Sequence, residues 1–343
     1  MCAVSFLHLG SSRGRIGRHV RVILTVKCCK INSMDEQAAK SRWPKKRLLW
    51  VPFGFTVAAL GTVLGISLYA AYSMTKVVRA PFEKKPNNLG LKYVDVSFTS
   101  RDGLTLRGWW LEAGDSSRVV VMIHGANGHR ADPNIKMLDI AREMVNVGYN
   151  VLMFDLRGHG QSEGKHVSLG YYEQRDLLGA IDYVKQRGMS KICVIGFSMG
   201  AATALMTATN CKQIDAIVAD SSFAYLADIV EPQFSKRSSL PKFFIPLILF
   251  VAKKIHGIDL SMPKPVDAVR QFTAPPILII HGGQDNTVPV EHASILARAC
   301  RNPSSRLWII PEAEHVGSYR ARPKEYIRQV ISFFSQALNP NQV

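Results

Sequence analysis

The stretch ICVIGFSMGAATAL, residues 192–205, decides the fold class of this chain of 343 residues. Its first four residues are apolar and predict a buried strand, and the run from Ala201 onward predicts a helix. Between them stands Ser198, with Gly196 and Gly200 two places to either side. A serine at such a sharp turn needs a strained backbone, and the flanking positions must lack side chains because strand and helix pass close together. This spacing is the G-x-S-x-G nucleophile elbow.

An acid and then a histidine follow downstream, in the order that this elbow requires. The apolar run 277–280 predicts a strand whose next loop carries Asp285, and the run 307–310 predicts another whose loop carries His315. Sites in open α/β sheets collect at the C-terminal ends of parallel strands. A serine hydroxyl needs an imidazole to take its proton and an anion to orient that imidazole. The order therefore predicts Ser198, Asp285 and His315 as a catalytic triad.

A second loop, HGANG at residues 124–128, follows another predicted strand. One of its backbone N–H groups, with the N–H of Met199, is expected to form an oxyanion hole. Two nearby residues leave alternatives open. Asp220 ends the strand expected after the elbow helix and is an alternative triad acid. His159 lies in a loop near the expected site and is either a loop-shaping residue or an alternative base.

On these residues, the chain resembles enzymes of the α/β-hydrolase fold over residues 91–338. Within that superfamily it is similar to the membrane-anchored ABHD13/Bem46-like serine hydrolases, which are grouped with the serine aminopeptidase S33 type. The resemblance implies Ser198 as nucleophile, Asp285 as orienting acid and His315 as base. It also implies that Ala126 and Met199 supply the oxyanion N–H groups, and it fixes no substrate. The matching stretches are HGANG (124–128), DLRGHGQS (155–162), the elbow, DSS (220–222) and the loops of Asp285 and His315.

Short apolar runs separated by helical patterns predict the fold, a mostly parallel, doubly wound α/β sheet. Residues 91–98 and 104–111 alternate apolar and polar side chains around a turn and predict a hairpin. Residues 223–266 interrupt the alternation, and the resemblance implies a helical cap inserted there. The apolar run 243–251 inside it is a lid, part of the core, or a segment that dips into a membrane surface. The expected core strands are 119–123, 151–154, 192–195, 214–219, 277–280 and 307–310, and 172–186 is an expected helix.

Residues 48–72 form a run of 25 positions without a charge, which exceeds the roughly 20 needed to cross a bilayer. Basic residues precede the run and aromatic residues stand near both ends, as at membrane interfaces. We therefore expect a transmembrane helix over 48–73, preceded by a basic cytoplasmic leader at 1–47 and followed by a linker at 74–90. The positive-inside rule places the hydrolase domain on the extracytoplasmic side. A buried core helix and a cleaved signal peptide are the alternatives.

Charge and cysteine usage restrict the function further. Residues 1–47 hold a net +9 of the formal +17, so much of the basic excess lies in the leader. The protein starts at Met1 or, as an alternative, at Met34, in which case residues 1–33 are a wrongly assigned extension. We read this charge as membrane topology rather than nucleic-acid binding. The six cysteines have no metal spacing and indicate no disulfide framework. No cofactor or metal is expected.

The sequence thus predicts a membrane-anchored serine hydrolase that cleaves an ester or thioester of a small-molecule or lipid-like acyl substrate. One alternative is an S33-type serine aminopeptidase, in which Asp228 or Glu231 of the cap would hold an α-amine. The other is a binding protein without catalysis on the same fold, since a fold does not fix a function. The oligomeric state and the natural acyl group stay open.

Overall fold

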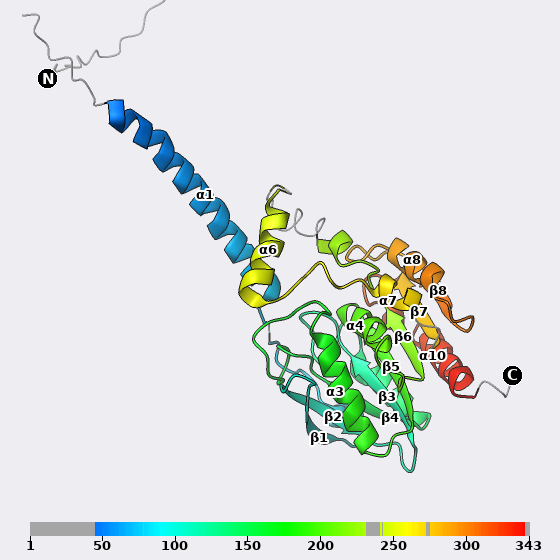
Figure 1. Ribbon diagram of the computed structural model, residues 1–343. Coiled ribbons are helices and arrows are strands. Elements are labelled where there is room, and N and C mark those ends of the chain that lie inside the picture. Colours follow the sequence, from blue (N-terminus) through cyan, green and yellow to red (C-terminus); the bar gives the residue numbers. More distant parts are fainter. Residues whose placement is uncertain (1–44, 78, 231–240, 242, 272–274, 340–343) are drawn as a thin grey trace, which may run out of the picture. The chain divides into compact units, whose positions relative to one another are not determined.

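The computed structural model describes residues 45–77, 79–230, 241, 243–271 and 275–339. At its centre lies an eight-stranded sheet with the strand order β1-β2-β4-β3-β5-β6-β7-β8 (Figure 1). The pairs β1–β2 and β2–β4 are antiparallel, and the other five are parallel. The strands are β1 (Val94–Thr99), β2 (Thr105–Leu111), β3 (Arg118–Ile123), β4 (Asn150–Phe154), β5 (Lys191–Phe197), β6 (Ala216–Asp220), β7 (Ile277–Gly282) and β8 (Arg306–Ile310).

Helices precede, connect and follow these strands, and several of them cover the two faces of the sheet. They are α1 (Lys45–Thr75), α2 (Met137–Asn146), α3 (Glu173–Gln186), α4 (Met199–Ala208), α6 (Phe244–His256), α7 (Pro265–Gln271), α8 (Glu291–Ala299), α9 (Ser318–Ala321) and α10 (Pro323–Leu338), with a short 3₁₀ helix, η1, at Pro86–Leu89. The predicted doubly wound, mostly parallel sheet is confirmed, and so are the hairpin and the expected helix at 172–186.

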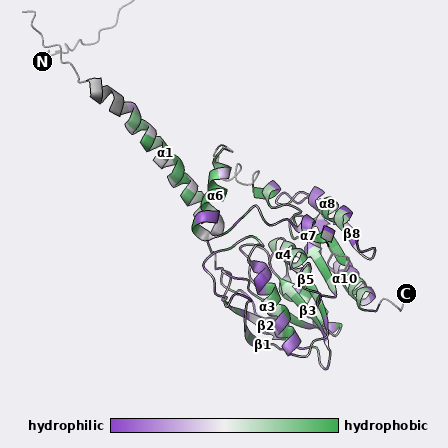
Figure 2. Ribbon diagram, viewed as in Figure 1, coloured by the Kyte–Doolittle hydropathy of each residue, from purple (hydrophilic) through white to green (hydrophobic). Residues whose placement is uncertain are grey.

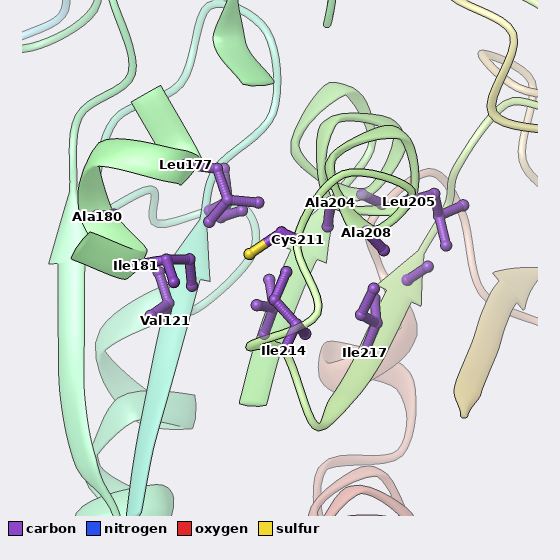
Figure 3. Close-up of a cluster of buried hydrophobic side chains, with 14 of the residues drawn as sticks. Val121, Leu177, Ala180, Ile181, Ala204, Leu205, Ala208, Cys211, Ile214 and Ile217 are labelled. Carbon is purple, nitrogen blue, oxygen red and sulfur yellow. The ribbon is translucent and has the colours of Figure 1, made fainter. Parts of the chain in front are cut away.

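Strand side chains alternate between two separate cores, as the period of two in a strand requires. In β3, Val119 and Val121 pack in one hydrophobic cluster while Val120 and Met122 pack in the other. The first cluster lies under α3, α4, α7 and α8, and the second under α2 and α10. Figure 3 shows the first of these cores, with Val121 among side chains of α3 and α4. Because both faces are covered, the central strands β3 to β7 are nearly continuous apolar runs.

Helix α1 contains one stretch, Pro52–Ser73, that is long and apolar enough to cross a membrane by length and composition. Hydrophobic residues recur along it in Figure 2. Many of them are exposed, including Phe55 at 74% and Leu60 at 64%. An apolar helix exposed in this way differs from a core helix, whose apolar side is covered. The predicted leader lies almost wholly outside the described residues, as does the candidate start at Met34.

The segment expected to form the cap has two described parts. Residues 223–230 begin two residues after the end of β6, and α6 comes after residues that lie outside the described ones. One side of α6 is buried through Phe244, Ile248 and Val251, in a cluster that also holds Ala71 of α1. The opposite side leaves large apolar side chains in contact with solvent.

Part of the predicted linker is fastened to the domain. The Arg79 guanidinium donates hydrogen bonds to the carbonyl oxygens of Gly160 and Ser162, both at 2.7 Å. The Phe82 ring packs against the ring of Trp109, with the centroids 5.3 Å apart. The chain between α1 and β1 is therefore held against the loop that follows β4.

Candidate active site

The turn between β5 and α4 carries Ser198 in a strained conformation, with φ 52° and ψ −115°. Its N–H donates to the carbonyl of Asp220 in the neighbouring strand at 2.8 Å, which fixes the turn to the sheet. A Cβ on Gly196 would lie 2.6 Å from the Gly200 carbonyl oxygen, and one on Gly200 would lie 2.5 Å from the oxygens of Ile123 and His124. Only glycine fits at either flank, for the steric reason expected of this elbow.

The structure brings together the three residues of the predicted triad. Nε2 of His315 lies 2.9 Å from Oγ of Ser198, and Nδ1 of the same ring lies 2.7 Å from Oδ2 of Asp285. Both distances are within normal hydrogen-bond range. With Nδ1 protonated and bonded to the carboxylate, Nε2 is the unprotonated nitrogen and faces the serine hydroxyl. This geometry suits transfer of the hydroxyl proton to the imidazole.

Asp285 is held on both carboxylate oxygens. Oδ1 accepts hydrogen bonds from the N–H groups of Thr287 and Val288, at 2.9 and 2.8 Å. Oδ2 accepts from His315 and lies 3.3 Å from Nε2 of His281. Burial alone raises the pKa of a carboxyl group, but the hydrogen bonds from His281 and His315 outweigh it and lower the pKa of Asp285 below its usual value. The carboxylate is therefore ionised and oriented at neutral pH.

Asp220 occupies a different position from Asp285, the predicted triad acid. Its Oδ1 accepts hydrogen bonds from the hydroxyls of Ser221 and Ser318, both at 3.0 Å. The Ser221 oxygen in turn accepts the N–H of Val316, the residue after His315, at 3.1 Å. Val316 has φ 50°, which a β-branched residue rarely adopts. Asp220 thus stabilises the strained loop that carries the imidazole, whereas Asp285 bonds the imidazole itself.

Ser221 and Ser318 were missed as site residues in the sequence. The DSS stretch at 220–222 pointed to Ser221, since it is one of the stretches that match the resembled family. No local sequence pattern links Ser221 or Ser318 to the His315 loop. Burial raises the pKa of Asp220 to about 6, although the Ser221 and Ser318 hydroxyls oppose this shift. Its other oxygen, Oδ2, is buried without a hydrogen-bond partner among the described residues. A charged Asp220 is therefore costly at this place.

The loop after β3 lies directly beside the elbow. A Cβ on Gly125 would come 3.3 Å from the Ser198 Cβ, so the two turns are in close contact. The next two residues, Ala126 and Asn127, line the cavity around Ser198 together with Met199. The Met199 N–H belongs to the first turn of α4, where no carbonyl of the helix is within reach. Both predicted oxyanion donors thus lie beside the serine.

Two buried histidines hold this loop in place. His159 accepts the N–H of Asn127 on Nε2 at 3.2 Å, and its Nδ1 lies 2.8 Å from the carbonyl of Arg157. His124 likewise accepts the N–H of Leu156 at 3.0 Å. Burial lowers the pKa of both rings, which keeps them neutral and able to accept. His159 therefore shapes the loop, while His315 contacts the serine.

Ser198 and His315 open into a cavity of about 900 Å³. That volume lies in the upper part of the range for small-molecule sites, roughly 300–1,000 Å³. The described lining is mostly apolar and includes Leu169, Phe223 and Leu226. Among the described residues, no group of three or more His, Cys, Asp or Glu side chains is placed to hold a metal ion.

Comparison with known proteins agrees with this geometry. Residues 114–256 match the family model of serine aminopeptidases of the S33 type. An esterase of Pyrococcus furiosus, Pf2001, superposes with a TM-score of 0.65 at 29% identity, over 76% of this chain and 99% of the esterase. The chain has the α/β-hydrolase fold. This hydrolase is 29% identical over 236 residues to YqkD of Bacillus subtilis (67% of this chain, 75% of YqkD). It is 26% identical over 292 residues to the α/β-hydrolase domain-containing protein WAV2 of Arabidopsis thaliana (80% of this chain, 91% of WAV2).

Proposed function

We propose that this hydrolase is a membrane-anchored serine hydrolase that cleaves an ester or thioester of an acyl or lipid-like substrate. The observation that carries the proposal is the continuous hydrogen-bonded series from Asp285 through His315 to Ser198, with distances of 2.7 and 2.9 Å. The esterase likeness at 29% identity supports the choice of an ester. The exposed apolar stretch Pro52–Ser73 supports the anchor, with the basic leader on the cytoplasmic side.

The reaction follows from the positions of the groups. The Ser198 oxygen attacks the carbonyl carbon while its proton passes to Nε2 of His315, and Asp285 stabilises the imidazolium that forms. The N–H groups of Ala126 and Met199 donate to the tetrahedral oxyanion. When that intermediate collapses, the imidazolium gives its proton to the leaving oxygen or sulfur. Water then cleaves the acyl-enzyme in the same manner, with His315 again as base.

The second candidate is an S33-type aminopeptidase, which the family match favours. An aminopeptidase needs a carboxylate that holds the α-amine of its substrate. Asp228 is exposed, and Glu231 lies outside the described residues. Asp132 is the acidic side chain among the described lining of the Ser198 cavity. If the chain is an aminopeptidase, Asp132 is therefore the residue to bind the amine.

One assay separates the two candidates. Full-length protein in detergent is given p-nitrophenyl butyrate and, separately, alanine p-nitroanilide, with Ser198→Ala measured beside the wild type. We expect turnover of the ester that depends on Ser198, and a kcat/KM for the anilide at least a hundredfold lower. Faster cleavage of the anilide, abolished in Asp132→Asn, would replace the esterase by the aminopeptidase. Ester turnover by Ser198→Ala equal to the wild type would refute both.

A further inference from the structure

The C-terminal end of α1 takes part in the cavity that holds Ser198. Four of its residues line that cavity: Ile66, Tyr69, Ala70 and Ser73. Their spacing of three, one and three residues places them on one face of the helix. One wall of the cavity therefore comes from the stretch that is apolar enough to cross a membrane.

This wall is fixed to the domain. Ala71 and Thr75 of α1 are fully buried. The Thr75 carbonyl accepts the N–H of Val167 at 3.0 Å, and Lys76 forms an antiparallel bridge with His166. Val167 is itself part of the cavity lining. The last turns of α1 are thus bonded to the loop that follows β4, so their side chains keep their place in the wall.

The outer face of the same turns is apolar and open. Leu64 is 47% exposed, and Leu68 and Tyr72 are likewise exposed. Residues 66–73 are the last two turns of the stretch Pro52–Ser73, so they lie at one end of the candidate span. An acyl chain held in a bilayer beside that end would meet the same helix that borders the cavity.

Helix α6 adds a second apolar surface next to this end of α1. Its Phe250 and Ile255 are exposed at 57% and 58%, and Lys253 and Lys254 stand among them. Exposed apolar side chains beside lysines are typical of helices that lie in a membrane interface. The buried side of α6 shares a hydrophobic cluster with Ala71, so this surface belongs to a helix that packs against the same end of α1.

Residues of the segment after β6 add apolar side chains to the same lining. They are Leu226, Ile229 and Val230, which belong to one hydrophobic cluster with Ile66 and Ala70 of α1, while Lys76 is a charged residue of the lining. We propose that α1 forms one wall of an acyl-binding cavity and that the substrate is an ester of a long acyl chain, which reaches Ser198 along this helix. The inference rests on the proposed function and deepens it, because it states what the cavity selects.

The test uses variants in which a larger side chain on α1 reduces the volume of the cavity. Ala70→Leu and Ser73→Leu each add a branched side chain to the wall. Ala59→Leu is the matched control, since Ala59 is exposed on the same helix, about 16 Å away at 1.5 Å per residue, outside the cavity. For each full-length variant in detergent, kcat/KM is measured with p-nitrophenyl acetate and with p-nitrophenyl dodecanoate.

We expect Ala70→Leu and Ser73→Leu to lower the dodecanoate-to-acetate ratio of kcat/KM at least tenfold, and Ala59→Leu to change it less than twofold. Activity on the acetate shows in the same experiment that each variant is folded. A ratio in Ala70→Leu and Ser73→Leu that stays within twofold of the control would overturn the role of α1. A wild type that hydrolyses neither ester would instead overturn the proposed function, so the two failures are distinguishable.

Discussion

The two walls of the Ser198 cavity are held by different forces. The catalytic wall, formed by the elbow and the loops of Asp285 and His315, consists of polar groups bonded to one another at 2.7 to 3.1 Å. The apolar wall, formed by α1 and residues 226–230, contributes shape and hydrophobic surface. A hydrogen bond depends on the distance and angle between its donor and acceptor, whereas apolar packing depends on the volume of the side chains. Damage to the catalytic wall should therefore affect every substrate alike, and damage to the apolar wall should depend on the length of the acyl chain.

The largest effect is expected from loss of the nucleophile. Ser198→Ala should lower kcat roughly 10⁴- to 10⁶-fold, because the members of such a triad act as a unit. The factor should be equal for p-nitrophenyl acetate and dodecanoate when both are measured by steady-state hydrolysis. A loss of activity on the dodecanoate alone would contradict the expectation that damage to the catalytic wall affects every substrate alike.

Replacement of the orienting acid comes next. Asp285→Asn keeps the shape of the side chain but cannot hold Nδ1 of His315 in its protonated tautomer, so kcat should fall roughly 10³- to 10⁴-fold. Asp267→Asn is the control, since Asp267 is a surface residue that pairs with Arg270. Comparable rates for the two variants would contradict the role of Asp285 and favour Asp220 as the acid of the triad.

Asp220→Asn tests the acid behind the catalytic wall through the free energy of unfolding. The folded state holds the proton up to a pKa of about 6, whereas the ordinary value is 3.8. Between these values the unfolded state binds fewer protons, so the stability of the wild type falls as pH rises from about 4 to 6. The variant lacks this loss and should gain about 2 kcal/mol relative to the wild type between pH 4 and pH 7.

Thermal unfolding of both proteins at a series of pH values measures this difference. The groups that share the environment of Asp220 are His281, His315 and Tyr326, and all three are present in both proteins. Parallel curves for the wild type and Asp220→Asn would contradict the raised pKa.

The smallest effect is expected at Ser221, which connects Asp220 to the His315 loop. Ser221→Ala removes the acceptor of the Val316 N–H and should lower kcat about fivefold with little change in KM, since one net hydrogen bond contributes about 1 kcal/mol. Ser222→Ala is the matched control, because its hydroxyl donates to the Phe223 carbonyl, away from that loop. Equal effects of the two variants would mean that Ser221 does not position the imidazole.

The sequence predicted the catalytic wall better than the apolar wall. Strands covered on both faces are apolar runs, and the triad follows them in a set order, so β5, β7 and β8 and their loops could be placed without coordinates. The bonds from Ser318 and Val316 to the 220–221 pair join segments almost a hundred residues apart, and no local pattern reveals such contacts. This is why Asp220 remained an alternative acid.

Hydropathy also did not predict the part of the apolar wall that α1 contributes. It predicts that α1 is long enough to span a bilayer but not that Ile66 and Ala70 line the cavity of Ser198, because that depends on which face of the helix the domain covers. The expected linker shows the same limit. The sequence predicted only a linker at 74–90, yet Arg79 and Phe82 contact groups in the loops after β3 and β4 and in β2.

The most direct test of the activated serine is covalent labelling of the full-length protein with a fluorophosphonate, followed by mass spectrometry of the labelled peptide. The account predicts a single adduct on Ser198 in the wild type, and labelling at least a hundredfold slower in His315→Ala, which keeps the nucleophile but lacks its base. An adduct on another residue, no adduct on folded wild-type protein, or equally fast labelling of His315→Ala would contradict it.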